Sequence, residues 1–102
     1  MKTIASASTS DIQQFLHDHQ NWSMKEHKLH REFVFSDFAE AFGFMAQVAL
    51  IAERSQHHPE WCNVYNKVSI DLCTHEVNNI TERDFILAQK IDKISLPLIQ
   101  IA

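Results

Sequence analysis

The chain has 102 residues, of which 45% are hydrophobic and 22% charged, and its formal net charge is −4. A chain of this length fits one domain with one core, which we expect to comprise residues 1–102. The negative charge and the scattered Lys and Arg residues exclude a general nucleic-acid binder, because such proteins neutralise phosphates with clustered basic side chains.

The composition also predicts a cytoplasmic protein. The N-terminal stretch lacks the apolar core of a signal peptide, and no apolar run approaches the roughly 20 residues that span a bilayer. Cys62 and Cys73 follow neither a CxxC spacing nor a framework of several pairs. Both are therefore expected to be reduced thiols.

The first third of the chain predicts a helix followed by two short strands. The stretch TSDIQQFLHDH offers Ser10 or Asp11 as the N-cap, with apolar residues at positions 12, 15 and 16 on one helical face. Alternation between positions 22 and 35 then predicts two strands that are joined near positions 27–28.

The stretch SDFAEAFGFMAQVALIAERSQ is the clearest helix, with Ser36 or Asp37 as its cap. Its sheet-facing side is expected to comprise Phe38, Ala41, Phe42, Met45, Val48, Ala49 and Ala52. The opposite side is almost as apolar, and a helix that is apolar all round is usually buried on both sides. Since one small domain cannot cover both, we predict an oligomer interface through Phe44, Gln47 and Ile51; the alternative is an apolar patch on a monomer.

The second half predicts a hairpin and a last helix. Apolar residues at positions 64, 68, 70 and 72 indicate a half-buried strand, with a turn near Asn66-Lys67. The stretch NNITERDFILAQKIDKI then starts a helix with Thr81 as N-cap and Asp84 at the third position, and SLPLIQIA is an apolar tail. The order α-β-β-α-β-β-α predicts an α+β fold, an antiparallel sheet with helices on one face.

Three histidines are candidates for chemistry. His57 and His58 stand between a helix end and a strand, and a hairpin would return His75 toward them. Three imidazoles around one cavity would suit proton transfer, because His titrates near pH 6.5. Metal binding has less support, since neighbours in an extended chain point to opposite sides and HExxH or CxxC spacings are absent. A metal trio of Glu53, His57 and His75 stays open, as does a solvated loop.

The wider pattern resembles the pterin-4a-carbinolamine dehydratase family. The segments HHPEWCNVYNKV, THE and TERDFILA carry the resemblance, which extends back through FSDFAEAFGFMAQVALIAE and LHREFVF to Trp22. The family's functional pattern matches Glu53, His57-His58-Pro59, Trp61 with Tyr65, His75 and Asp84.

The resemblance implies both a fold and a reaction. The fold would be a four-stranded antiparallel sheet with three helices on one face, in homodimers or homotetramers. The reaction would be dehydration of 4a-hydroxytetrahydropterin, the product of aromatic amino acid hydroxylases, to quinonoid dihydropterin and water. It needs no metal and no cofactor, because the pterin is the substrate.

A second role is the alternative that the resemblance leaves open. Some animal members bind the dimerisation segment of a homeodomain transcription factor and act as coactivators. They use the surface of the central helix, and such a role would allow a nuclear location.

The resemblance further implies residue roles. His57 and His75 would transfer protons, His58 would orient the pterin, and Glu53 would hold an imidazole tautomer or be only a charged helix end. The expected pterin contacts are Gln56, Cys73, Thr74, Glu76, Trp61, Trp22 and Asp84, although a helix cap explains Asp84 fully. The chain departs from the family where Gln56 replaces a common Asp, Cys73 a common Ser, and Asn78-Asn79 a Gly pair.

Overall fold

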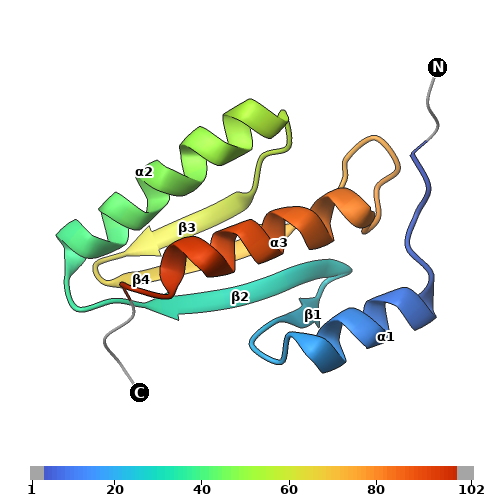
Figure 1. The fold of residues 1–102 in the computed structure, drawn as a ribbon, viewed down its shortest axis with the longest axis horizontal. Coiled ribbons are helices and arrows are strands. Elements are labelled where there is room, and N and C mark those ends of the chain that lie inside the picture. Colours follow the sequence, from blue (N-terminus) through green and yellow to red (C-terminus); the bar gives the residue numbers. More distant parts are fainter. Residues whose placement is uncertain (1–3, 99–102) are drawn as a thin grey trace.

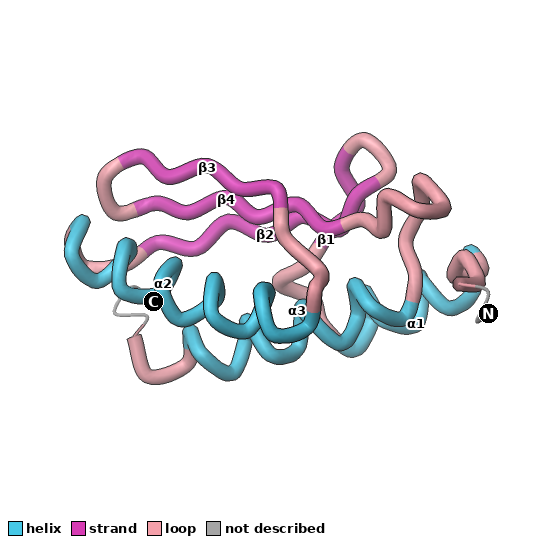
Figure 2. The backbone as a smooth tube through the Cα atoms, turned by 90° about the horizontal axis from the view of Figure 1, so that it is seen from above, coloured by secondary structure: helices cyan, strands magenta, loops and turns pink. Residues whose placement is uncertain are grey.

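A four-stranded antiparallel sheet is covered on one face by three helices (Figures 1 and 2). The computed structural model describes residues 4–98, so the end of the apolar tail lies outside the described residues. In chain order the elements are α1 (Thr9–Asp18), β1 (Ser23–Lys25), β2 (Lys28–Val34), α2 (Phe38–Ser55), β3 (Glu60–Val64), β4 (Lys67–Leu72) and α3 (Glu82–Ser95). The predicted fold class and element order are confirmed.

The two hairpins join through their inner strands, which gives the sheet order β1-β2-β4-β3. Strand β2 pairs with β4 in a register that places Leu29 opposite Leu72 and Phe33 opposite Val68. These four side chains are at most 1% exposed, because alternation turns them all toward the helices. Apart from Val34, the alternate positions of both strands carry polar side chains, which point to the other face of the sheet.

The hairpin between β3 and β4 turns one residue earlier than predicted. Tyr65 and Asn66 form the turn, and Tyr65 has a positive φ of 53°. Val64 consequently pairs with Lys67 and is 68% exposed, although the sequence pattern grouped it with the buried Val68. A two-residue turn fixes this register, so Val64 and Val68 lie on opposite faces.

Helix caps set where the three helices begin. The N-cap of α1 is Ser8, two residues before the predicted Ser10, and Asp11 completes its capping box as the third helical residue. Asp37 caps α2 as expected, since its side chain accepts from the backbone N–H of Glu40. Thr81 and Asp84 form the predicted capping box of α3.

The orientation of α2 differs from the prediction. Its buried residues are Ala41, Phe44, Val48 and Ala52, while Phe38 and Phe42 are 50% and 56% exposed. Phe44 was therefore wrongly placed on the outer face: it is fully buried against the rings of Phe33 and Phe35. The outer face is still apolar, because Phe38, Phe42 and Leu50 occupy it. No helix among residues 4–98 is long and apolar enough to cross a membrane.

Candidate active site

A buried polar network joins the end of α2, the end of β4 and the start of α3. His57 Nε2 lies 2.6 Å from Asp84 Oδ1, and the hydroxyl of Thr74 donates to Asp84 Oδ2 at 2.8 Å. Thr81 Oγ1 is 2.6 Å from Thr74 Oγ1. His57 is 8% exposed, and Asp84 is fully buried. Within the described residues no buried side-chain polar atom lacks a partner, as a rigid buried network requires.

The local backbone explains why His57 points inward. Helix α2 ends at Ser55, and its C-cap Gln56 adopts the left-handed conformation with φ 52°. This reverses the chain, and the backbone N–H of His57 donates to the carbonyl of Ala52. On the other side, Asp84 occupies the third position of α3, where its carboxylate also accepts from the backbone N–H of Thr81.

His57 lines a cavity of about 410 Å³ between the end of α2 and the first half of α3. The cavity is lined by Ser55, Gln56, His57, Glu76, Arg83, Ile86, Leu87 and Lys90. It combines apolar side chains of α3 with charged groups of both signs. Its volume falls in the range of about 300–1,000 Å³ that is common for small-molecule sites, which combine apolar walls with a few placed polar groups.

The two neighbouring histidines face different surroundings, as expected for an extended segment. His58 is exposed, and its Nε2 lies 3.0 Å from Glu53 Oε1, whereas His57 is buried against Asp84. The imidazole that Glu53 contacts is therefore that of His58. The metal trio of Glu53, His57 and His75 is not assembled, because its first two members are bound to these other partners.

His75 lies with another group of residues, so the three imidazoles do not converge on one cavity lining. Its side chain is 68% exposed, with Nε2 3.5 Å from Glu60 Oε2 and Nδ1 3.9 Å from Cys73 Sγ. Lys28 binds the other oxygen of Glu60 at 2.6 Å, and this hydrogen bond raises the pKa of Lys28 above its usual value. Burial raises the pKa of the Cys73 thiol.

Glu76 and Arg83 form an ion pair at the cavity, with Arg83 Nη1 3.2 Å from Glu76 Oε2. A hydrogen bond from its own backbone N–H lowers the pKa of Glu76, and the Arg83 guanidinium adds to this effect. Glu76 thus presents a carboxylate that stays ionised below the usual range of such groups.

Comparisons with known proteins match this chain to one family. The family described as Pterin 4 alpha carbinolamine dehydratase matches residues 5–94. A relative from Solibacter usitatus, named "Putative pterin-4-alpha-carbinolamine dehydratase", is 51% identical over 86% of this chain and 93% of its own length. The chain belongs to the pterin-4a-carbinolamine dehydratase family. The expectation that the chain belongs to a family of hydro-lyases, drawn from the sequence resemblance, is confirmed.

Solved structures agree with this assignment. A structure from Brucella melitensis, described as a transcriptional coactivator/pterin dehydratase, is 41% identical with a TM-score of 0.85 and covers 88% of this chain and 98% of that one. A pterin dehydratase-like protein described as a RuBisCO assembly factor has a TM-score of 0.62 over 74% of this chain and 87% of its own. At 21% identity, that second likeness shows the fold alone.

The two tryptophans expected as walls of the pterin site do not line this cavity. Trp22 is 3% exposed in the core, and its indole N–H donates to the carboxylate of Asp92. Asp92 is eight residues beyond Asp84 on α3, about 12 Å along the helix. Trp61 is half-buried on β3 and packs against the core rather than lining the cavity. A tryptophan suits the wall of a pterin site as well as the protein core, so the sequence could not show which of the two places each tryptophan occupies.

Sequence reasoning missed Arg83 and Lys90, which supply the positive charge of the cavity. Their spacing could have revealed them, because residues 83, 86, 87 and 90 of the predicted helix lie on one helical face next to Asp84. This helical face borders the cavity because the neighbouring residues Asp84, Ala88 and Ile91 are buried.

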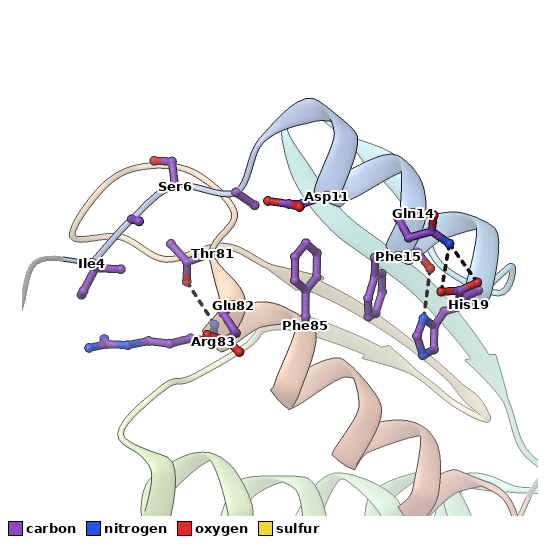
Figure 3. A pocket seen from close by; sticks show the side chains of 13 residues that line it. Ile4, Ser6, Asp11, Gln14, Phe15, His19, Thr81, Glu82, Arg83 and Phe85 are labelled. Atoms are coloured by element: carbon purple, nitrogen blue, oxygen red, sulfur yellow. Dashed lines mark hydrogen bonds between the residues drawn. The ribbon is translucent and has the colours of Figure 1, made fainter.

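A larger cavity, of about 790 Å³, lies on the other side of the α3 N-terminus, between residues 4–7 and α1. Figure 3 shows Phe85, Phe15 and His19 in a row along its wall, with ring centroids 4.6 and 4.1 Å apart. None of the three predicted histidines lines it. Size alone does not make it the reactive site. Arg83 lines both cavities, but Asp84 and the histidines of the family pattern do not line this one.

Proposed function

We propose that this protein dehydrates 4a-hydroxytetrahydropterin to quinonoid dihydropterin, and that His57 is a proton-transfer group in this reaction. The observation that supports the proposal is the His57–Asp84 pair at a 410 Å³ cavity in a chain of this family. The reaction would need no cofactor, and the predicted cytoplasmic location stays a prediction.

The chemistry requires two proton transfers and no redox step. The bond between C4a and its hydroxyl oxygen breaks, and that oxygen leaves as water after receiving a proton. A ring nitrogen loses its proton, and its electron pair forms the new carbon–nitrogen double bond. An imidazole can donate or accept at neutral pH, and each such group typically contributes about 10²–10⁴-fold to the rate.

Asp84 would fix the state of His57 during these transfers. An ionised carboxylate only accepts hydrogen bonds, so His57 Nε2 carries a proton toward Asp84. The other ring nitrogen, Nδ1, is then the atom that exchanges a proton with the substrate. Thr74 is committed to Asp84 and Thr81, so we assign it to holding Asp84 rather than to pterin contact.

Glu76 and Gln56 suit the pyrimidine edge of a pterin. A carboxylate can accept from the amino group and the ring N–H of that edge, and the amide of Gln56 adds a donor and an acceptor. Arg83 would position Glu76 through their ion pair. We assign the second proton transfer to His75 and the orientation of the ring to His58, which Glu53 contacts. These roles require the pterin to extend beyond the cavity lining, because neither side chain belongs to it.

A direct dehydration assay tests the proposal, with quinonoid dihydropterin followed by its absorbance. His57→Ala and His75→Ala should each lower kcat by about 10²-fold or more. His17→Ala is the matched control, because His17 is an exposed histidine of α1 far from the cavity lining. A double variant of His57 and His75 that retained the wild-type rate would refute the assignment.

The exposed face of α2 supports a second proposal, that copies of this chain associate through it. Phe38 and Phe42 lie 5.8 Å apart between ring centroids, and Leu50 is 68% exposed farther along the same helix. Contiguous exposed apolar side chains of this size commonly mark an interface. We therefore propose a homodimer or homotetramer through this face in place of the predicted interface. Of the three residues predicted for that interface, Phe44 is buried, Ile51 is half-buried and Gln47 is exposed.

Sedimentation of Phe42→Glu tests the association. A buried charge at the interface should dissociate the oligomer, whereas Gln13→Glu, which adds the same charge to an exposed position of α1, should not. The same face is the candidate surface for a coactivator role, a role that the description of the Brucella melitensis structure names. Binding of a transcription factor segment that Phe42→Glu abolishes, with dehydration intact, would favour that role.

A further inference from the structure

A cluster of metal-binding side chains lies where β3 begins and β4 ends, apart from the cavity that His57 lines. Glu60, Cys73 and His75 each offer one ligand atom, and these atoms lie within 4.8 Å of one another. Glu60 pairs with Asp71, whose neighbours Ile70 and Leu72 face the helices, so the cluster starts on the opposite face of the sheet. Carboxylate, thiolate and imidazole are the three ligand types that zinc prefers in proteins.

The ligand atoms lie somewhat farther apart than in a formed tetrahedral site. Zn–S bonds of 2.3 Å and Zn–N bonds of 2.0–2.1 Å place two ligand atoms about 3.5 Å apart. Cys73 Sγ lies 3.9 Å from His75 Nδ1, and Glu60 Oε2 lies 3.5 Å from the other ring nitrogen, Nε2. Because one imidazole binds a given ion through one nitrogen, the three ligand atoms that can act together lie within 4.8 Å of one another. Cys73 is held at the end of a buried strand, whereas the exposed side chains of His75 and Glu60 can move toward it.

The charges around the cluster allow a cation. Lys28 occupies Glu60 Oε1 at 2.6 Å and leaves Oε2 on the side of His75. A thiolate and a carboxylate together carry two negative charges, which offset those of a divalent ion. The nearby ammonium of Lys28 repels a cation and already binds Glu60, which weakens Glu60 as a ligand. The affinity for the ion should therefore depend most on the soft thiolate of Cys73.

We infer that Glu60, Cys73 and His75 bind a thiophilic divalent cation such as Zn²⁺, with a fourth position open to water. A consequence follows that rests on the proposed function. A metal-bound His75 cannot transfer a proton, so the ion inhibits dehydration rather than assisting it.

Binding is tested with Co²⁺ as a spectroscopic probe on the full-length protein freed of metal. A sulfur ligand gives a thiolate-to-cobalt charge-transfer band, which Zn²⁺ should then remove by displacement. Wild type and Cys62→Ser should show the band, and Cys73→Ser should not. Cys62 is the matched control, because it is an exposed thiol two residues from Glu60 and on the same face of β3.

The affinity for Zn²⁺ gives a second measure. Loss of a group that only supports a ligand typically weakens binding about 10–100-fold, so Cys73→Ser and His75→Ala should each weaken it by at least this factor. Equal affinity in wild type and Cys73→Ser, or no charge-transfer band in wild type, would overturn the site.

The inhibition is tested separately. Each protein's dehydration rate is measured with and without Zn²⁺ and expressed relative to its own metal-free rate. Wild type and Cys62→Ser should be inhibited, and Cys73→Ser should retain its own rate at the same Zn²⁺ concentration. Binding without inhibition would overturn the inhibitory role alone. A wild type inactive without metal would refute the proposed function, while the cobalt spectrum still decides the site.

Discussion

His57 and Asp84 lie 27 positions apart in the chain, and a 2.6 Å contact between Nε2 and Oδ1 joins them in the core. The same carboxylate accepts from the backbone N–H of Thr81 at the start of α3. One side chain therefore begins a helix and holds an imidazole. The orientation of His57 is consequently tied to the position of α3, and the candidate site cannot form without this helix.

Replacing Asp84 with Asn should impair both tasks. The variant keeps the shape but loses the charge, and the amide donates where Thr74 and Thr81 also donate. We expect a loss of about 1.5–3 kcal/mol in the free energy of unfolding, the worth of hydrogen bonds to a charged group. The rate of dehydration should fall by about 10²-fold or more at saturating substrate, because His57 loses its orientation. Urea unfolding and steady-state kinetics measure the two effects.

Glu82→Gln is the control, since Glu82 is an exposed acid in the same first turn of α3. Its stability and rate should stay near those of wild type. A fully active Asp84→Asn protein would show that Asp84 serves only as a cap.

Phe44 and Phe42 should respond oppositely to truncation. Phe44 is fully buried, so Phe44→Ala should lower the free energy of unfolding by about 3–5 kcal/mol. Phe42 is 56% exposed, so Phe42→Ala should change monomer stability by less than about 0.5 kcal/mol and should instead weaken association. Urea unfolding and sedimentation separate the effects. If Phe42→Ala proved the more destabilising in the monomer, the orientation of α2 would be wrong.

Most of the fold could be predicted because each element carried a local signal. Caps such as Thr81 and alternation such as Val68, Ile70 and Leu72 depend on neighbouring residues alone. The orientation of α2 could not, because Phe38, Phe42 and Phe44 are equally apolar and local pattern does not rank them. Contact of Phe44 with Phe33 and Phe35 decides it, and those contacts are long-range.

The sequence predicted which residues belong to the candidate site better than it predicted how they are arranged. The pairing of His57 with Asp84 was not foreseen, because a cap explained Asp84 without a second partner. His75 was expected at the cavity, but its partners Glu60 and Cys73 come from strand register, which a histidine count cannot reveal. Asn78, which replaces the first glycine of the family's Gly pair, takes a positive φ of 51°, a conformation that Asn adopts more readily than most residues.

The carboxyl group of Asp92 should make stability depend on pH. Burial raises its pKa above 3.8, although the Trp22 indole and the Arg31 guanidinium act in the opposite direction. Because the folded state then binds the proton more tightly than the unfolded state, this contribution to stability is present at low pH. It is lost as the pH rises through the raised pKa.

Asp92→Asn removes that titration while keeping a partner for the indole of Trp22. The free energy of unfolding of wild type, relative to this variant, should fall as the pH rises from the ordinary pKa of an aspartate through the raised pKa of Asp92, and should then level off. Urea unfolding across this range measures the difference. A difference that grew with pH would mean that Arg31 outweighs burial. Asp18→Asn, at an exposed position in α1, controls for general charge effects.

Replacing Gln56 with glycine should stabilise the protein, whereas the same replacement of a glutamine within a helix should destabilise it. It ends α2 with φ 52° and ψ 38°, a conformation that costs a non-glycine residue about 1–2 kcal/mol. The greater freedom of glycine in the unfolded chain offsets part of this, so Gln56→Gly should raise the free energy of unfolding by up to about 1 kcal/mol. Gln13 is exposed within α1, and Gln13→Gly should lower it by about 0.5–1 kcal/mol. Urea unfolding of both variants gives the two signs. A loss of stability in Gln56→Gly as large as that in Gln13→Gly would show that the side chain of Gln56 contributes more than its backbone costs.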